Sequence, residues 1–131
     1  MQNVIWWLLA AFIIFTLFRK RFFMFNNKNV KNINADEGYK LINENKNIII
    51  LDVRTKGEFE SGHIPKAKNI PVQQLSTRIK ELEKYKDVPI LVHCASGGRS
   101  PSAVRALAKN NFTQIYHLNK GLMSWKHQLK K

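Results

Sequence analysis

Residues 89–108 read PILVHCASGGRSPSAVRALA, and this stretch decides the fold. Its first five residues form an apolar run typical of a buried strand, and the alternating pattern from residue 102 onward predicts a helix. Between them, Gly97 and Gly98 permit backbone angles that other residues avoid, so the loop can curl its amides inward. Ser100 is suited to cap the helix, and Pro101 is suited to its first position, where no N–H is needed. We therefore expect a strand, a tight loop and a helix.

The only cysteine of the chain, Cys94, lies where this strand ends. A lone cysteine is most often a small buried core residue. Here two glycines, an arginine and a serine follow within six residues, and core packing does not explain them. A thiol inside a ring of N–H donors at a helix N-terminus is acidic, because both surroundings favour the thiolate. The loop is therefore predicted to form an anion cradle around a nucleophile.

The loop from Cys94 to Ser100 resembles the active-site loop of rhodanese-like domains, which are sulfurtransferases. Four further segments occur in the order expected for that family. Three precede the loop, LDVR at 51–54, EFE at 58–60 and GHIPKA at 62–67, and GLMSW at 121–125 comes after it. The resemblance covers about residues 30–129. It implies an α/β fold with a five-stranded, mostly parallel sheet flanked by helices.

The resemblance also implies a sulfur-transfer reaction at Cys94. The thiolate attacks the sulfane sulfur of a small anion such as thiosulfate, carries it as a persulfide and passes it to cyanide or to a thiol, including a thiol on a protein. No metal and no organic cofactor is implied. The loop amides are expected to stabilise the thiolate and then the persulfide. The substrate-binding and persulfide-binding residues of the loop are Ala95, Ser96, Gly97, Gly98, Arg99 and Ser100.

The roles of three side chains in the loop are less narrowly defined. The Arg99 guanidinium either binds an anionic donor or folds back and braces the loop. The hydroxyls of Ser96 and Ser100 are both close enough in sequence to donate to sulfur.

Two other functions are compatible with such a loop. The domain could be a persulfide carrier or binding module that passes sulfur to a partner with little turnover of small molecules. It could also be a phosphatase or an arsenate reductase. Phosphatases with a related loop have five residues between cysteine and arginine, whereas only four separate Cys94 from Arg99. The smaller ring suits a sulfur atom better than a phosphate.

Asp52 and Arg54 end another apolar run, at residues 47–53. They either shape the rim of a pocket or form an ion pair that holds loops in place. We favour the structural role, and the resemblance implies the same. Two histidines are assigned structural roles as well. His63 is expected to make a structural hydrogen bond, and His93 points away from Cys94 if the strand is regular.

Strands alternate with helices along the rest of the chain, which indicates a mostly parallel sheet. No internal repeat interrupts this order. Strands are expected at 30–33, 47–53, 68–71, 89–93 and 114–118, and helices at 34–45, 55–61, 72–86, 102–110 and 121–129.

Charge and cysteine content limit the partners. The formal net charge is +13, with 22 basic and 9 acidic residues. Nucleic acid, an anionic membrane and small anions would all suit this charge. The sequence has no nucleic-acid-binding motif, so nucleic acid is not expected as a partner. One cysteine excludes a disulfide framework within the chain and a cysteine-rich metal site.

The N-terminus predicts a membrane anchor at residues 1–25, followed by the rhodanese-like domain at 26–131. Residues 4–18 are apolar except for Thr16, and with the first three residues they give 18 uncharged positions. A cleaved signal peptide would carry its positive charge before such a run, whereas RKR follows it here at residues 19–21. The segment lacks the polar face of a helix that lies flat on a membrane.

The orientation of this anchor follows from the same basic cluster. Positive residues that flank a membrane helix tend to stay in the cytoplasm. We therefore expect a single-pass protein of the inner, or cytoplasmic, membrane whose domain faces the cytoplasm. The aromatic residues at 22–25 are expected to form a collar at the membrane interface.

Overall fold

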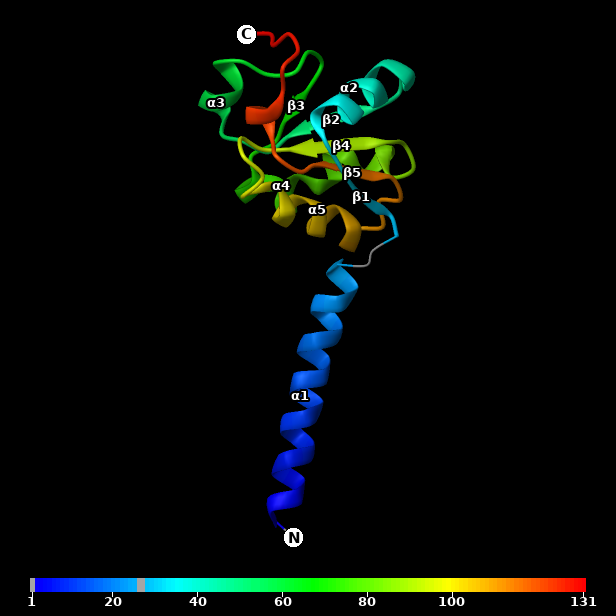
Figure 1. The fold of residues 1–131 in the computed structure, drawn as a ribbon, viewed down its shortest axis with the longest axis vertical. Coiled ribbons are helices and arrows are strands. Elements are labelled where there is room, and N and C mark those ends of the chain that lie inside the picture. The colour runs from blue at the N-terminus through cyan, green and yellow to red at the C-terminus, as the bar shows by residue number, and fades with distance from the viewer. Residues whose placement is uncertain (1, 26–27) are drawn as a thin grey trace.

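Five short strands form one sheet in the order β1-β5-β4-β2-β3 (Figure 1). All neighbouring strands run parallel, which confirms the predicted five-stranded α/β fold. The computed structural model describes residues 2–25 and 28–131, and it describes side chains for residues 2–19 and 28–131. The strands are β1 Val30–Ile33, β2 Ile49–Asp52, β3 Lys68–Asn69, β4 Ile90–His93 and β5 Ile115–Leu118.

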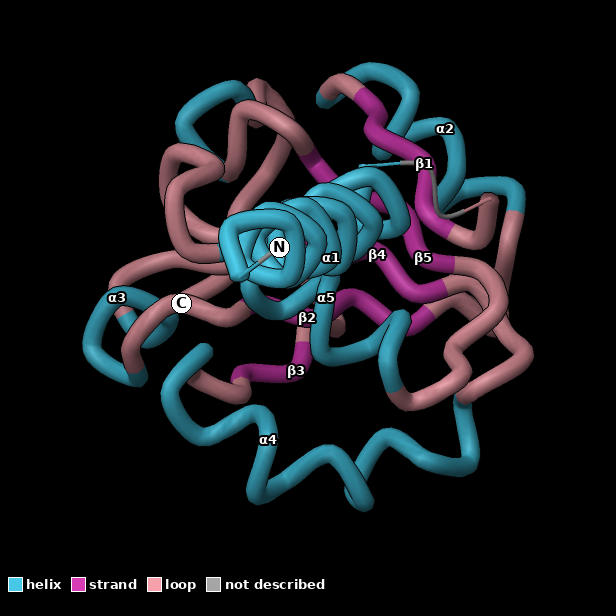
Figure 2. The backbone as a smooth tube through the Cα atoms, turned by 90° about the horizontal axis from the view of Figure 1, so that it is seen from below, coloured by secondary structure: helices cyan, strands magenta, loops and turns pink. Residues whose placement is uncertain are grey.

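Helices cover both faces of this sheet (Figures 1 and 2). Helix α2 (Ala35–Glu44) lies on one face, and α4 (Leu75–Arg78) and α5 (Ser100–Lys109) lie on the other. The short helix α3 (Lys56–Glu60) follows β2. Since both faces are covered, the central strands β2 and β4 are continuous apolar runs up to their last residues, whereas the edge strands β1 and β3 carry lysine and asparagine.

Each face of the sheet has its own apolar core. Leu91 packs toward α2, in a cluster with Ile33 and Leu118. The next residue along β4, Val92, packs on the opposite side with Leu107 and other residues of the larger cluster. Successive side chains of a strand point to opposite faces, so one short strand contributes to both cores.

Capping boxes fix the starts of α2 and α3. The Asn34 side chain accepts a hydrogen bond from the Glu37 amide at 2.8 Å, and the Glu37 carboxylate accepts one in return from the Asn34 amide at 3.4 Å. Thr55 and Glu58 repeat this arrangement at the start of α3. Each box satisfies backbone N–H groups that a helix leaves without internal partners.

The predicted single helix over residues 72–86 is wrong. This segment consists of a 3-10 turn at Val72–Gln74, the single α-helical turn of α4, and a second 3-10 stretch at Ile79–Tyr85. Leu75 and Leu82 are fully buried, as the helical pattern suggested. Most helical stability comes from packing, and two buried anchors are too few to impose regular winding on the segment.

The predicted C-terminal helix over residues 121–129 is also wrong, since only Leu122–Ser124 winds, as a 3-10 turn. The amide of Leu122 donates to the carbonyl of Cys94, and the amide of Met123 donates to that of Ala95, each at 2.9 Å. These backbone bonds tie the start of the segment to the loop after β4. Trp125 then adopts an extended conformation, with φ −80° and ψ 119°.

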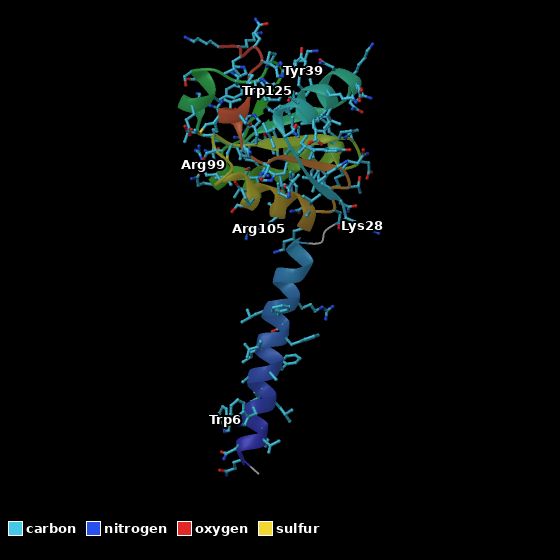
Figure 3. All side chains as sticks on the ribbon, viewed as in Figure 1. Trp6, Lys28, Tyr39, Arg99, Arg105 and Trp125 are labelled. Carbon is cyan, nitrogen blue, oxygen red and sulfur yellow. The ribbon has the colours of Figure 1, made fainter. Side chains whose placement is uncertain are left out.

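Helix α1 (Gln2–Phe25) precedes the domain (Figure 3, with Trp6 labelled). Its window Gln2–Arg19 has a mean hydropathy of 1.5, and none of these residues is buried. By length and composition the helix can cross a membrane: 24 residues extend about 36 Å, against a hydrocarbon core of about 30 Å. The predicted collar at 22–25, the side chains of Lys20 and Arg21, and linker residues 26–27 lie outside the described part of the chain.

A buried ion pair holds the end of β2. The Arg54 guanidinium donates to the Asp52 carboxylate at 2.7 Å and to the carbonyl of Gly62 at 2.7 Å. Asp52 is fully buried and Arg54 nearly so. The Asn69 side-chain amide donates to the carbonyls of both residues, so the pair joins β2, β3 and the turn after α3. This geometry agrees with the structural role favoured from the sequence.

Replacing Arg54 by methionine should lower the free energy of unfolding by about 3–5 kcal/mol, because the Asp52 carboxylate would stay buried without its partner. Chemical denaturation monitored by circular dichroism measures the loss. The matched control is Arg78→Met, which breaks an exposed ion pair with Glu81 and should leave the stability nearly unchanged. Equal effects of the two substitutions would contradict the assigned role.

Candidate active site

Cys94 follows β4 directly, at the edge of the sheet where the carboxyl ends of the strands lie. Ligands of open parallel sheets bind at this edge. The residue is only 1% exposed. The Gly97 amide donates to Sγ at 3.1 Å, and the Ser100 hydroxyl lies 3.4 Å from Sγ. The amides of Arg99 and Ser100 also act on this thiol, because both lower its pKa.

These donors make the thiol acidic. Burial raises the pKa of the Cys94 thiol, but the hydrogen bonds of Ser100, Arg99 and Gly97 outweigh it, and the net pKa is lowered. Of the predicted ring of amide donors, the hydrogen bond seen in the structure is the one from Gly97. A thiolate is the reactive form of cysteine, so the arrangement favours nucleophilic chemistry at this sulfur.

The chain after β5 forms the outer support of the loop. Gly97 has φ +96°, and a side chain there would collide with the carbonyl oxygen of Asn119. Gly121 has φ +66°, and a Cβ atom there would lie 2.5 Å from the carbonyl oxygen of Ala95. Both positions therefore require glycine, for the positive φ and for the close approach of two backbones.

Arg99 points out of the loop toward α3, on the side of the domain where Figure 3 labels it. Its guanidinium donates two hydrogen bonds to the Glu58 carboxylate, at 2.6 and 2.8 Å. Hydrogen bonding from Arg99 is the main cause that lowers the pKa of Glu58 to about 2. Of the two roles considered for Arg99, the contact in this structure is the bracing one.

Ser100 does not cap α5. Arg99 occupies the N-cap position without a side-chain hydrogen bond, so Ser100 is the first helical residue and Pro101 the second. The predicted cap is wrong because the Ser100 hydroxyl is used elsewhere, between Cys94 Sγ and the His117 ring. Pro101 still suits its place, because the first turn leaves its amides without helical partners.

The remaining predicted loop residues lie farther from the chemistry. Ser96 and Gly98 are exposed, and Ala95 is half-buried. Within the described residues, the Ser96 hydroxyl makes no hydrogen bond to Sγ. Asp52 bonds Arg54 rather than the sulfur.

The two histidines near these segments have structural contacts. His63 stacks on Phe59, with ring centroids 3.8 Å apart, and its Nδ1 lies 2.9 Å from the Phe59 carbonyl, which confirms the expected structural hydrogen bond. His93 is fully buried, with Nε2 at 3.8 Å from the Asp52 carboxylate. Neither imidazole bonds Cys94 Sγ.

The sequence did not identify three residues near the sulfur. In the sequence Glu58 stands out only as part of the EFE segment at 58–60, and nothing in that segment points to Arg99. His117 and Asn32 are 85 positions apart in the sequence, yet the parallel pairing of β5 with β1 places them side by side. The alternation of Ile115 and His117 along β5 could have indicated that this imidazole faces α5.

Comparison with known proteins identifies the family. A model of the rhodanese-like domain matches residues 34–128. The chain therefore belongs to the rhodanese-like domain family. The crystal structure of a rhodanese-related protein from Thermoplasma volcanium superposes with a TM-score of 0.68 at 33% identity, covering 76% of this chain and 97% of that chain.

Two sequence relatives extend this result. YqhL of Bacillus subtilis is 32% identical over 133 residues, which cover 99% of this chain and 98% of YqhL. A protein from Allochromatium vinosum named sulfurtransferase is 27% identical over 96 residues, covering 73% of this chain and 88% of that protein. The similarity to YqhL thus extends over the N-terminal helix as well as the domain.

Gly97→Ala should make Cys94 less reactive, because the new methyl group displaces the loop and removes the Gly97 amide from Sγ. A hydrogen bond to a charged group contributes about 1.5–3 kcal/mol, so the rate of alkylation near neutral pH should fall about tenfold or more. Iodoacetamide labelling followed by mass spectrometry measures this rate. Gly98→Ala is the control, since a Cβ there meets nothing within 4 Å. A wild-type rate for Gly97→Ala would refute the geometry.

Proposed function

We propose that this protein is a membrane-tethered sulfurtransferase that works through a persulfide on Cys94. The observation that carries the proposal is the set of polar groups around one buried sulfur: the Gly97 amide donates to Cys94 Sγ at 3.1 Å, and the Ser100 hydroxyl lies 3.4 Å from it. Family membership and the relative named sulfurtransferase support it.

The reaction has two displacement steps. The Cys94 thiolate attacks the sulfane sulfur of a donor such as thiosulfate, a new S–S bond forms, and the bond between the two donor sulfurs breaks to release sulfite. A thiol acceptor, as its thiolate, or cyanide then attacks the outer sulfur of the persulfide. The Cys94–sulfur bond breaks, and its electron pair returns to the protein as the thiolate. Splitting the transfer in this way is covalent catalysis.

The loop suits both charged forms of the sulfur. The Gly97 amide already points at Sγ and stabilises negative charge there without reorganising during the reaction. The same donors can follow the charge when it moves to the outer sulfur of the persulfide. The four-residue span between Cys94 and Arg99 closes a ring of this size around a sulfur atom.

A persulfide carrier is a second candidate, and the Arg99–Glu58 pair favours it. With the guanidinium held by Glu58 at 2.6 Å, the loop offers an anionic donor no free arginine side chain. Such a protein would hold sulfur for a partner and turn over small molecules slowly. The same pairing weighs against a phosphatase, because an oxyanion substrate would need that guanidinium.

Helix α1 provides the tether in this proposal. Its apolar window Gln2–Arg19 spans the inner membrane, and the basic residues 19–21 keep the domain in the cytoplasm. The partners are then a small sulfur anion, a thiol acceptor and the membrane, through residues 4–18. A protein acceptor would be met at the membrane surface.

Treating the full-length protein in detergent with thiosulfate should add one sulfur atom, about 32 Da, to its intact mass. A reductant should remove the added mass, and Cys94→Ser should not acquire it. If folded wild-type protein stays unmodified, the thiosulfate proposal is wrong. Once the adduct is present, thiosulfate–cyanide turnover separates the two candidates, because fast turnover indicates an enzyme and a stable persulfide indicates a carrier.

The orientation can be measured with engineered cysteines, since the chain has only Cys94 of its own. In a Cys94→Ser background, Lys131→Cys should react with a membrane-impermeant maleimide in inverted membrane vesicles and not in right-side-out vesicles. Gln2→Cys should show the opposite pattern. Labelling of both positions from the same side would exclude a single span.

A further inference from the structure

A chain of hydrogen bonds leads from the sulfur into the interior of the domain. Cys94 Sγ lies 3.4 Å from Ser100 Oγ, and Ser100 Oγ lies 2.6 Å from His117 Nε2. On the far side of the ring, His117 Nδ1 lies 2.9 Å from Asn32 Oδ1. We propose that His117 accepts the proton of the Cys94 thiol through the Ser100 hydroxyl, while Asn32 holds the imidazole in the tautomer that can do so.

The fold sets this alignment. His117 on β5 is the register partner of Asn32 on β1 and of Val92 on β4, so the three side chains point to the same face. Cys94 lies two residues beyond Val92, on that same face, and Ser100 begins the helix that covers it. Two of the four polar groups lie on strands, one directly follows a third strand and one begins a helix, and the shortest segment that contains them all runs over the 86 residues from 32 to 117.

The directions of these bonds follow from the Asn32 oxygen. Since Oδ1 can only accept, Nδ1 of His117 carries the proton, and Nε2 of the neutral ring is a bare acceptor. The Ser100 hydroxyl must then donate to Nε2. Its oxygen is left to accept, and the group that can donate to it is the Cys94 S–H. In the neutral form, Cys94 therefore donates to Ser100, and Ser100 donates to His117.

Proton transfer along this chain balances without another reactant. The Cys94 S–H bond breaks, its electron pair stays on sulfur, and the proton goes to Ser100 Oγ. The original hydroxyl proton of Ser100 goes to His117 Nε2. The products are a thiolate and an imidazolium, and the Ser100 hydroxyl now donates to the sulfur. A nucleophile, a base and a group that orients the base form the general pattern of an activated nucleophile.

Burial and charge are consistent with this assignment. His117 is 7% exposed, and burial lowers the pKa of its imidazole, so the ring is neutral and able to accept at neutral pH. The groups that face it are Asn32 from β1, Val92 from β4 and Ser100 from α5. The charged Arg99 side chain of the loop is bonded to Glu58 instead. The transfer creates a pair of opposite charges, which stabilise each other.

Within the proposed sulfur transfer, His117 is a positioning residue, because it acts on the sulfur through Ser100. Its contribution is to keep Cys94 reactive below the pKa of the isolated thiol. The alternative is a purely structural role, in which Ser100, His117 and Asn32 only satisfy one another's hydrogen-bonding groups. The two roles differ in the pH dependence of the thiol, since a merely structural histidine would change the stability alone.

The test is the rate of Cys94 alkylation by iodoacetamide, across about pH 5 to 10, on the full-length protein in detergent. The alkylation rate of the wild-type protein should stay on a plateau below the pKa of the isolated thiol, because the thiolate–imidazolium pair still supplies a thiolate there. His117→Phe should lose this plateau, so that the rate falls about tenfold for each pH unit below that pKa. Ser100→Ala should do the same, and the double variant should lose no more than either single one.

His127→Phe is the matched control. This imidazole stacks on Tyr39 of α2, with ring centroids 3.7 Å apart, and α2 covers the face of the sheet opposite α5, so the plateau should remain. A folded His117→Phe protein with the wild-type profile would overturn the proposal.

A second measurement needs no substitution of His117. Nitrogen-15 chemical shifts of the imidazole in the unmodified thiol protein should show a protonated Nδ1 and a bare Nε2. A proton on Nε2 in that form would refute the direction of the chain. Alkylation does not involve a sulfur donor, so this proposal and the proposed function can fail separately. If thiosulfate forms a persulfide but His117→Phe keeps the wild-type pH profile, only the proton transfer to His117 is refuted. If His117→Phe loses the plateau but no persulfide forms, only the proposed sulfur transfer is refuted.

Discussion

The close approach of two backbones, the loop after β4 and the turn after β5, is the constraint on which the site depends. The amides of Leu122 and Met123 bond the carbonyls of Cys94 and Ala95, each at 2.9 Å. With these carbonyls facing outward, the loop is free to turn later amides inward onto the sulfur. Gly97 and Gly121 make the approach possible, since a Cβ atom at either position would strike backbone of the other segment.

Much of the fold could be predicted because the central strands β2 and β4 are short apolar runs and alternate with helical patterns. The apolar run at residues 89–93 and the loop after it predicted that Cys94 lies at the end of a strand, and it directly follows β4. The predicted helices at 72–86 and 121–129 failed for a common reason. Helical spacing of apolar residues reports which side chains are buried, but contacts made elsewhere decide how the backbone winds. Trp125 illustrates this, since its side chain packs against the core although its backbone is extended.

The site was predictable to the extent that it is local in sequence. The loop residues follow one another, and the donation from the Gly97 amide to Sγ spans only three positions. The partners of the loop are distant: Glu58 is 41 residues from Arg99, and His117 is 17 residues from Ser100. Their proximity depends on strand order, in which β5 lies between β1 and β4. A single sequence carries no direct signal for that order, so these contacts emerged only from the structure.

Cys94 is only 1% exposed, so the protein without bound sulfur and the protein with a persulfide differ in the sulfur atom that a reactant can reach. An S–S bond is about 2.05 Å long, so an added sulfur places the reactive atom that much farther from Sγ. Because Cys94 is buried, large thiols and oxidants have little access to its Sγ when no sulfur is bound. Once sulfur is bound, an acceptor has to reach only the outer sulfur and not Sγ itself, so the depth to which it must enter the domain differs by about one S–S bond length.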